Sequence, residues 1–93
     1  MPKVVRNIFV QNTLGLHARP AMQFVDAANQ FTSNITVTKG GAEPGEADGK
    51  SVMQMIILAA EQGTTLQIIA EGEDAEAAVA ALVKLFDDKF GEE

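Results

Sequence analysis

Hydrophobic residues along the chain follow two kinds of spacing, and one of them predicts strands. Residues 3–11 are rich in β-branched side chains, and residues 34–38 and 65–71 place apolar residues at every second position. Such patterns are typical of strands with one buried face. The sequence therefore predicts strands over these three ranges.

Three other segments repeat their apolar residues at helical spacing. The first is predicted to run from Ala18 to Asn29, and its buried face is expected to hold Ala21, Phe24 or Val25, and Ala28. The second begins at Ser51, and the third follows its expected N-cap, Asp74, with a buried stripe that ends at Phe86. Asp87, Asp88, Lys89 and residues 91–93 are typical of a solvated, fraying end.

Residues 42–49 show neither spacing clearly. Pro44 cannot donate to a strand ladder, and Gly45 and Gly49 loosen the segment further. We expect a surface loop without a role of its own, with a partner-specific loop as the alternative.

Composition narrows the class of protein. The 93 residues predict a single domain over residues 1–93, and a net charge of −6 argues against nucleic-acid or anionic-membrane partners. With no cysteine and one histidine, disulfides are excluded and a metal site is not expected. The first residues lack a signal-peptide run, and no apolar stretch approaches the ~20 residues of a membrane span. We expect a cytoplasmic monomer without a cofactor.

The one histidine lies where the first strand gives way to the first helix. Gly15 permits a sharp turn, and Pro20 fits only the first turn of a helix, so His17 is expected at the N-cap or next to it, with the helix beginning at Ala18. A helix N-terminus binds anions and disfavours imidazolium, which would leave His17 a neutral nucleophile. Arg19 adds a planar guanidinium suited to phosphate oxygens. From these residues alone, a phosphate-carrying imidazole and a histidine that merely caps the helix remain equally open.

Three ordered motifs carry a family resemblance. They are Gly15-Leu16-His17-Ala18-Arg19-Pro20-Ala21, Gly49-Lys50-Ser51-Val52-Met53 and Glu71-Gly72-Glu73-Asp74-Ala75. They resemble the HPr family, the histidine phosphocarriers of the phosphoenolpyruvate-dependent phosphotransferase system. The resemblance extends from about Val4 to Phe90. It implies an α+β open-faced β-sandwich of order β-α-β-β-α-β-α, in which three helices cover one face of a four-stranded antiparallel sheet, with a short edge strand within residues 42–49.

The resemblance also implies a function. His17 would accept a phosphoryl group from phosphorylated enzyme I, on Nδ1 as in the family, and would pass it to an enzyme IIA. Arg19 would take part in the transfer, and Ala18 and Arg19 would bind the phosphate. Such a protein is a carrier between two enzymes and is not itself an enzyme.

Ser51 has two compatible interpretations. Ser51 and Gln54 fit a capping box, in which the serine hydroxyl accepts from an N–H of the first turn and the glutamine side chain reaches back to the Ser51 N–H. The resemblance instead implies a regulatory phosphorylation site, with an HPr kinase/phosphorylase as a possible partner. The residues alone favour the cap, and the resemblance makes the two interpretations equally favoured.

The helix after Ser51 is apolar nearly all round, which is more than one buried face requires. Met55 and Leu58 are expected in the core, so the remaining apolar residues indicate an exposed patch. By the resemblance, partners would dock on Met22, Val52, Met53 and Ile56. Methionine suits a surface that must fit several partners.

Two other functions stay open, as do two branches of the system. The chain could be a regulatory module that acts through Ser51, although an intact Arg19 argues against this, or a small metabolite-binding domain. Leu14 favours the nitrogen-regulatory branch, whereas Arg19-Pro20 favours the sugar branch. Lysines that many family members carry on the docking surface are replaced here by other residues: Asp26, Asn29 and Gln54.

Overall fold

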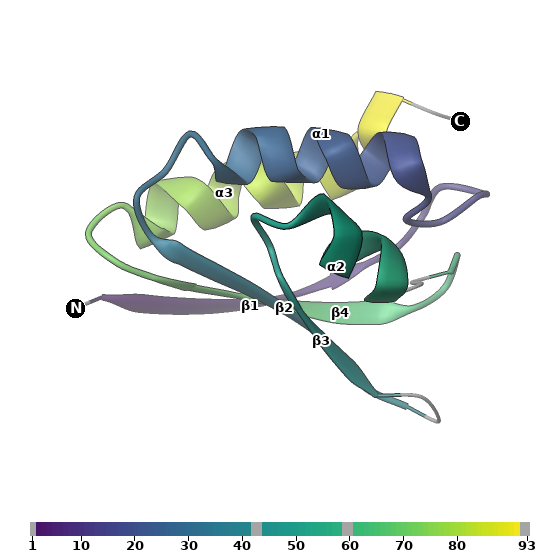
Figure 1. Cartoon of the computed structure of the whole chain (residues 1–93), viewed down its shortest axis with the longest axis horizontal. Helices are drawn as coiled ribbons and strands as arrows, with labels where there is room; N and C mark the ends of the chain where they lie inside the picture. Colours follow the sequence, from purple (N-terminus) through teal and green to yellow (C-terminus); the bar gives the residue numbers. More distant parts are fainter. Residues whose placement is uncertain (1, 42–43, 59–60, 92–93) are drawn as a thin grey trace.

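The computed structural model describes residues 2–41, 44–58 and 61–91, which form four strands and three α-helices in the expected order (Figure 1). The strands are β1 (Lys3–Phe9), β2 (Asn34–Lys39), β3 (Gly45–Asp48) and β4 (Thr65–Glu71). The helices are α1 (Ala18–Ala28), α2 (Val52–Leu58) and α3 (Ala75–Asp87), followed by a 3₁₀ turn, η1 (Lys89–Gly91). No helix in these described ranges has the length and apolar character needed to cross a membrane.

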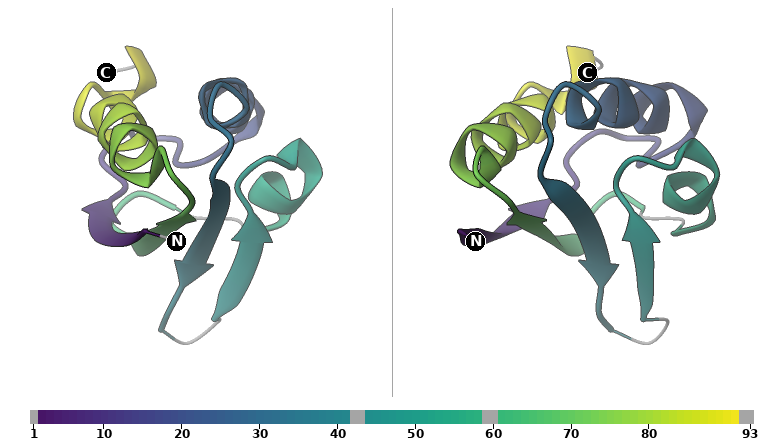
Figure 2. Two further views of the ribbon diagram at one scale, coloured as in Figure 1. Left: turned by 90° about the vertical axis from the view of Figure 1, so that its left-hand side faces the viewer. Right: turned by 60° about the vertical axis from the view of Figure 1, so that its left-hand side comes forward.

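The strands form one antiparallel sheet in the order β1-β4-β2-β3. β4 lies in the middle of the pairing, where Ile69 faces Val5 on β1 and Thr36 on β2. All three helices lie on the same side of this sheet (Figures 1 and 2). The expected open-faced sandwich is therefore confirmed.

The core lies between the inner face of the sheet and the buried sides of α1 and α3. Both of the alternatives proposed for α1, Phe24 and Val25, are buried. The Phe24 ring meets Phe86 of α3 edge to face, with 5.9 Å between ring centroids. Burying side chains of this size contributes about 1.5–3 kcal/mol each, which fixes α1 on the sheet.

Asp87, Asp88, Lys89 and Gly91 at the end of the chain are exposed as predicted, but the residue among them that the prediction left out is not. Phe90 in η1 is buried, and its ring centroid lies 4.7 Å from that of Phe86. Lys89 and Phe90 have φ angles of 54° and 55°, a left-handed conformation that costs residues with a Cβ about 1–2 kcal/mol each. Burial of the aromatic ring offsets this cost. As a result, η1 lies beside the N-terminal end of α1 (Figures 1 and 2).

Residues 45–48 correct the prediction of a loop over 42–49. They form the edge strand β3, as the family resemblance implied, while residues 42 and 43 lie outside the described part of the chain. Gly49 follows β3 and donates its N–H to the carbonyl of Ile35 at 2.8 Å. A Cβ at Gly49 would lie 2.6 Å from Ile35 Cγ2, so only glycine allows this close approach into α2.

Asp74 occupies the predicted N-cap position of α3 but does not cap the helix with its side chain. Its carboxylate instead accepts hydrogen bonds from Thr32 and Ser33, in the loop between α1 and β2. The sequence pattern correctly placed Asp74 before the first residue of α3. It did not predict the hydrogen-bond partners of the carboxylate, because these lie about 40 residues away in the chain.

Candidate functional site

A short turn between β1 and α1 fixes the chain before the histidine. The side-chain amide of Asn12 donates to the carbonyl of Gly15 at 2.7 Å, and the Gly15 N–H donates back to the Asn12 carbonyl at 3.1 Å. Gly15 has a φ of 69°, so the predicted need for glycine is confirmed. Asn12 and Leu16 are both buried, which anchors the turn in the core.

Asn12 is a residue of the candidate site that the sequence interpretation missed. The signal was present, because asparagine at the start of a turn readily bonds to nearby backbone groups. Its burial, however, depends on the fold and could not be deduced from the local pattern.

His17 is the N-cap of α1, as predicted. Its backbone is extended, with φ −79° and ψ −170°, and its carbonyl accepts the first hydrogen bond of the helix from the Ala21 N–H at 3.0 Å. The imidazole is half-buried and makes no capping hydrogen bond to the helix. The side chain therefore lies at the positive end of the α1 dipole without serving as its cap, and the interpretation of His17 as a simple cap loses support.

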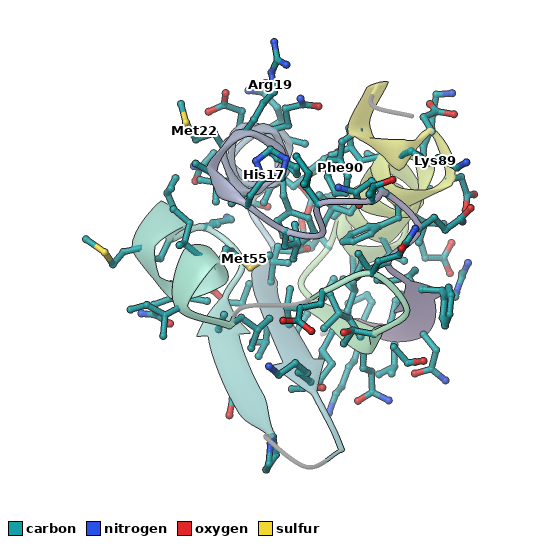
Figure 3. The ribbon with its side chains drawn as sticks, turned by 90° about the vertical axis from the view of Figure 1, so that its right-hand side faces the viewer. His17, Arg19, Met22, Met55, Lys89 and Phe90 are labelled. Atoms are coloured by element: carbon teal, nitrogen blue, oxygen red, sulfur yellow. The ribbon has the colours of Figure 1, made fainter. Side chains whose placement is uncertain are left out.

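The first turn of α1 is suited to an anion. It contains no acidic residue, and Pro20 lies there buried, where a missing N–H costs nothing. The exposed Ala18 and Arg19 follow His17 directly. Figure 3 shows the Arg19 side chain extending outward from α1, away from the His17 ring. The fold thus places both predicted residues at one helix end but leaves the guanidinium in solvent.

Ser51 shows only half of the predicted capping box. Its Oγ accepts a hydrogen bond from the Gln54 N–H at 3.2 Å. The Gln54 side chain does not reach back to Ser51, because the Ser51 N–H already donates to the Asp48 carbonyl at 3.0 Å. Gln54 Oε1 accepts instead from the Asp48 N–H at 2.8 Å, which ties α2 to the end of β3.

Lys50 makes a second hydrogen bond between elements that the sequence did not indicate. Its ammonium donates to the carbonyl of Phe31, just beyond the end of α1, at 2.7 Å. The residue before Ser51 therefore connects the start of α2 to the end of α1.

The exposed apolar patch is present, with one correction. Met22, Met53 and Ile56 are exposed, and Val52 is only partly so. Met55 and Leu58 are buried as predicted. In Figure 3, Met55 points into the space between α1 and α2, and Met22 projects from α1 on the side of α2.

The structure was searched for places that could hold a metal ion or a small ligand. In the described ranges, no three His, Asp or Glu side chains are grouped so as to hold a metal ion. An open hollow of about 650 Å³ lies over β2, β3 and the start of α2, with Asp48, Lys50 and Glu71 in its lining. A metabolite-binding domain would need a hollow with polar lining, and this hollow has one, but His17 is not among its lining residues.

Comparison with known proteins places these features in one family. Residues 4–88 match the family model described as the PTS HPr component phosphorylation site. The chain is 40% identical over 86 residues to the phosphocarrier protein HPr of Xylella fastidiosa, a match that covers 92% of this chain and 93% of that protein. It is 42% identical over 88 residues to the phosphocarrier protein NPr of Proteus mirabilis, covering 95% and 96% of the two chains.

The fold agrees with these sequence matches. The crystal structure of HPr from Thermoanaerobacter tengcongensis superimposes with a TM-score of 0.85 at 42% identity, covering 100% of this chain and 99% of that one.

Proposed function

The chain belongs to the HPr family of phosphocarrier proteins of the phosphotransferase system, and we propose that His17 is the residue that carries the phosphoryl group. The observation that supports this most strongly is the place of His17, half-buried at the N-cap of α1. The donor is phosphorylated enzyme I, and the acceptor is an enzyme IIA.

The transfer uses the groups that meet at this helix end. An imidazole nitrogen attacks phosphorus with its lone pair, a P–N bond forms, and the bond between phosphorus and the donor group breaks, with its electron pair leaving on the donor. The free N–H groups of the first turn of α1, including that of Ala18, bind the phosphoryl oxygens. The Arg19 side chain extends into solvent, where its guanidinium is able to turn toward His17. When the phosphoryl group is on His17, the guanidinium donates a charge-assisted hydrogen bond to a phosphoryl oxygen.

The partners dock beside His17, on Met22, Val52, Met53 and Ile56. Three of these side chains are exposed, and α1 and α2 pack against each other. Apolar side chains left in solvent on two packed helices are typical of a protein-binding surface.

Ser51 is the proposed regulatory site, modified by an HPr kinase/phosphorylase. It lies directly before Val52 and Met53, so a phosphate on its hydroxyl would add about two negative charges beside the docking residues. A partner covering these residues would have to remove water from that charge, which weakens docking. Phosphorylation of Ser51 would therefore slow transfer to His17 without unfolding the protein.

Incubation with enzyme I and labelled phosphoenolpyruvate tests the proposal. The wild-type protein should acquire label that is lost in acid and retained in base, as phosphoramidates behave, and His17→Ala should acquire none. Label on the His17→Ala protein would assign the phosphate to another residue. The same assay with enzyme IIA proteins of the sugar and nitrogen-regulatory branches identifies the acceptor.

A further inference from the structure

One lysine joins the start of α2 to the end of α1. The Lys50 ammonium donates to the Phe31 carbonyl at 2.7 Å, in a partly buried contact. Phe31 lies just beyond α1, and its N–H still donates to the carbonyl of Ala28, the last residue of that helix, at 3.2 Å. α1 has no basic residue in its own last turn. Lys50 therefore supplies, from another element, the cation that the negative end of the α1 dipole favours.

Negative charge surrounds Lys50 at the start of α2. The open hollow over β2, β3 and α2 has three carboxylates in its lining, and Lys50 is the one cation among these lining residues. The Asp48 carboxylate accepts from the Lys50 N–H at 2.9 Å, and the Asp48 carbonyl accepts from the Ser51 N–H at 3.0 Å. Lys50 is also the only Lys or Arg of the sequence between residues 40 and 83. A new negative charge on Ser51 would thus lie in the same turn as a carboxylate, with Lys50 as its neighbouring cation.

A phosphate on Ser51 would compete with the Phe31 carbonyl for the Lys50 ammonium. The end of α1 offers about half a negative charge, whereas a phosphate carries about 1.5 to 2 charges and presents three acceptor oxygens. At equal distance, the attraction of the ammonium to the phosphate is greater by about three- to fourfold. The lysine stem is flexible, so the ammonium of the residue next to Ser51 reaches the phosphate without movement of the backbone. The phosphate therefore wins this competition.

We propose that Lys50 is a switchable link between the two helices: its ammonium holds the end of α1 while Ser51 is unmodified, and a phosphate on Ser51 draws it away. This contact is called the Lys50 link below. The inference rests on the proposed function, in which Ser51 is a regulatory site. The ammonium exchanges one acceptor for another, so we expect little change in stability.

The position of the Lys50 link connects it to docking. The proposed docking residues are divided between α1, which carries Met22, and α2, and the two helices pack against each other. Opening the link releases one contact that fixes these two parts of the docking surface relative to each other. The loop after α1 stays in place, because the Asp74 carboxylate accepts from the Thr32 and Ser33 N–H groups at 2.8 and 2.9 Å. The expected change is therefore local.

Carbonyl NMR of the protein with phosphoserine at position 51 tests the proposal. The phosphoserine is incorporated during translation with a suppressor tRNA, so that no kinase is needed. The ¹³C′ signal of Phe31 responds to hydrogen bonds made to its oxygen, and phosphoserine should move it to the position found in unphosphorylated Lys50→Met. The amide signals of Thr32 and Ser33, whose acceptor is Asp74, should stay in place. A Phe31 signal that keeps its wild-type position would overturn the proposal.

Matched variants separate the Lys50 link from a direct effect of the phosphate charge on Phe31. In Lys50→Met, and equally in Lys50→Ala, phosphoserine at position 51 should leave the Phe31 signal where it is, because there is no ammonium to displace. Ser51→Ala changes the helix cap without adding charge and should keep the wild-type Phe31 signal. If phosphoserine moves the Phe31 signal as far in Lys50→Met as in the wild type, the proposal is wrong.

Transfer kinetics on the same samples separate this inference from the proposed function. If Phe31 responds to phosphoserine while the apparent KM of the protein in the enzyme I reaction is unchanged, the Lys50 link stands and the regulatory role of Ser51 fails. If the KM rises and Phe31 does not respond, the regulatory role stands on the phosphate charge alone and the Lys50 link fails.

Discussion

Asp74 and Ser33 are joined across 41 residues of sequence, with the Asp74 Oδ1 atom 2.9 Å from the Ser33 backbone nitrogen. The Ser33 hydroxyl donates to the same oxygen, and the Thr32 N–H donates to the other oxygen at 2.8 Å. Hydrogen bonds from Ser33 and then from Thr32 lower the pKa of Asp74 from 3.8 to about 2. The residue that precedes α3 thereby holds the loop between α1 and β2.

This pair predicts a pH dependence of stability. Because the folded protein lowers the pKa of Asp74, the stabilisation is complete above pH 3.8, and it falls away as the pH drops toward about 2. Asp74→Asn should therefore lower the Tm at neutral pH, and its Tm should converge with that of the wild type between about pH 4 and about pH 2. Thermal unfolding measured across this range checks the prediction. Asp26→Asn, a change of an exposed carboxylate on α1, is the control; a constant gap between wild type and Asp74→Asn at all pH values would contradict the account.

We expect the hydrogen bond of Asn12, in the turn before His17, to affect phosphoryl transfer as well as stability. Asn12→Ala removes the hydrogen bond to the Gly15 carbonyl, and losing such a buried bond costs about 1–3 kcal/mol of stability. We also expect slower phosphoryl transfer at saturating enzyme I, with KM little changed, because the proposed docking residues on α1 and α2 are not altered. Denaturant unfolding and steady-state kinetics measure the two effects. Asn34→Ala, an exposed asparagine on β2, should change neither, and wild-type transfer rates in Asn12→Ala would remove Asn12 from the site.

We expect substitution of Arg19 to change the rate of phosphoryl transfer without changing the fold. The Arg19 side chain is exposed, so Arg19→Ala should shift stability by no more than about 0.5 kcal/mol. The rate of transfer to His17 should fall by up to about 100-fold, as a lost donor to the transferring group allows. Arg19→Lys keeps the charge but not the planar fork and should recover the rate only in part. Transfer at the wild-type rate in Arg19→Ala would exclude it from the site.

We expect two substitutions of Ser51 to have different effects, one on stability and the other on the KM of phosphoryl transfer. Ser51→Ala loses the acceptor of the Gln54 N–H, so it should cost up to about 1 kcal/mol of stability while transferring phosphate normally. Ser51→Asp, an imperfect mimic with less charge than a phosphate, should keep its Tm but raise the apparent KM for this protein in the enzyme I reaction. Equal KM values for Ser51→Asp and wild type would leave Ser51 a helix cap and no more.

The sequence predicted features that depend on neighbouring residues. His17 could be placed at the N-cap of α1 because Gly15 and Pro20 lie within three residues of it, and each restricts the backbone by its own covalent structure. Met55 and Leu58 could be placed in the core because one side of a short helix has to face the sheet.

The features that were missed depend on residues far apart in the chain. The aromatic contact that buries Phe90, the carboxylate of Asp74 on the α1–β2 loop, and the ammonium of Lys50 at the end of α1 require knowledge of which segments meet. Likewise, Gln54 bonds to the Asp48 N–H at the end of β3, and the Ser51 N–H that it was expected to reach donates to the Asp48 carbonyl.

We expect His17 alone to carry the phosphoryl group, and NMR of the phosphorylated protein locates the phosphate. The protein is incubated with enzyme I and phosphoenolpyruvate and held at alkaline pH, and its ³¹P and imidazole NMR signals are recorded together with those of His17→Ala. We expect one phosphoramidate signal, coupled to the His17 ring and absent from His17→Ala. A phosphoryl signal that survives in His17→Ala, or a wild-type protein that stays unphosphorylated with active enzyme I, would contradict it.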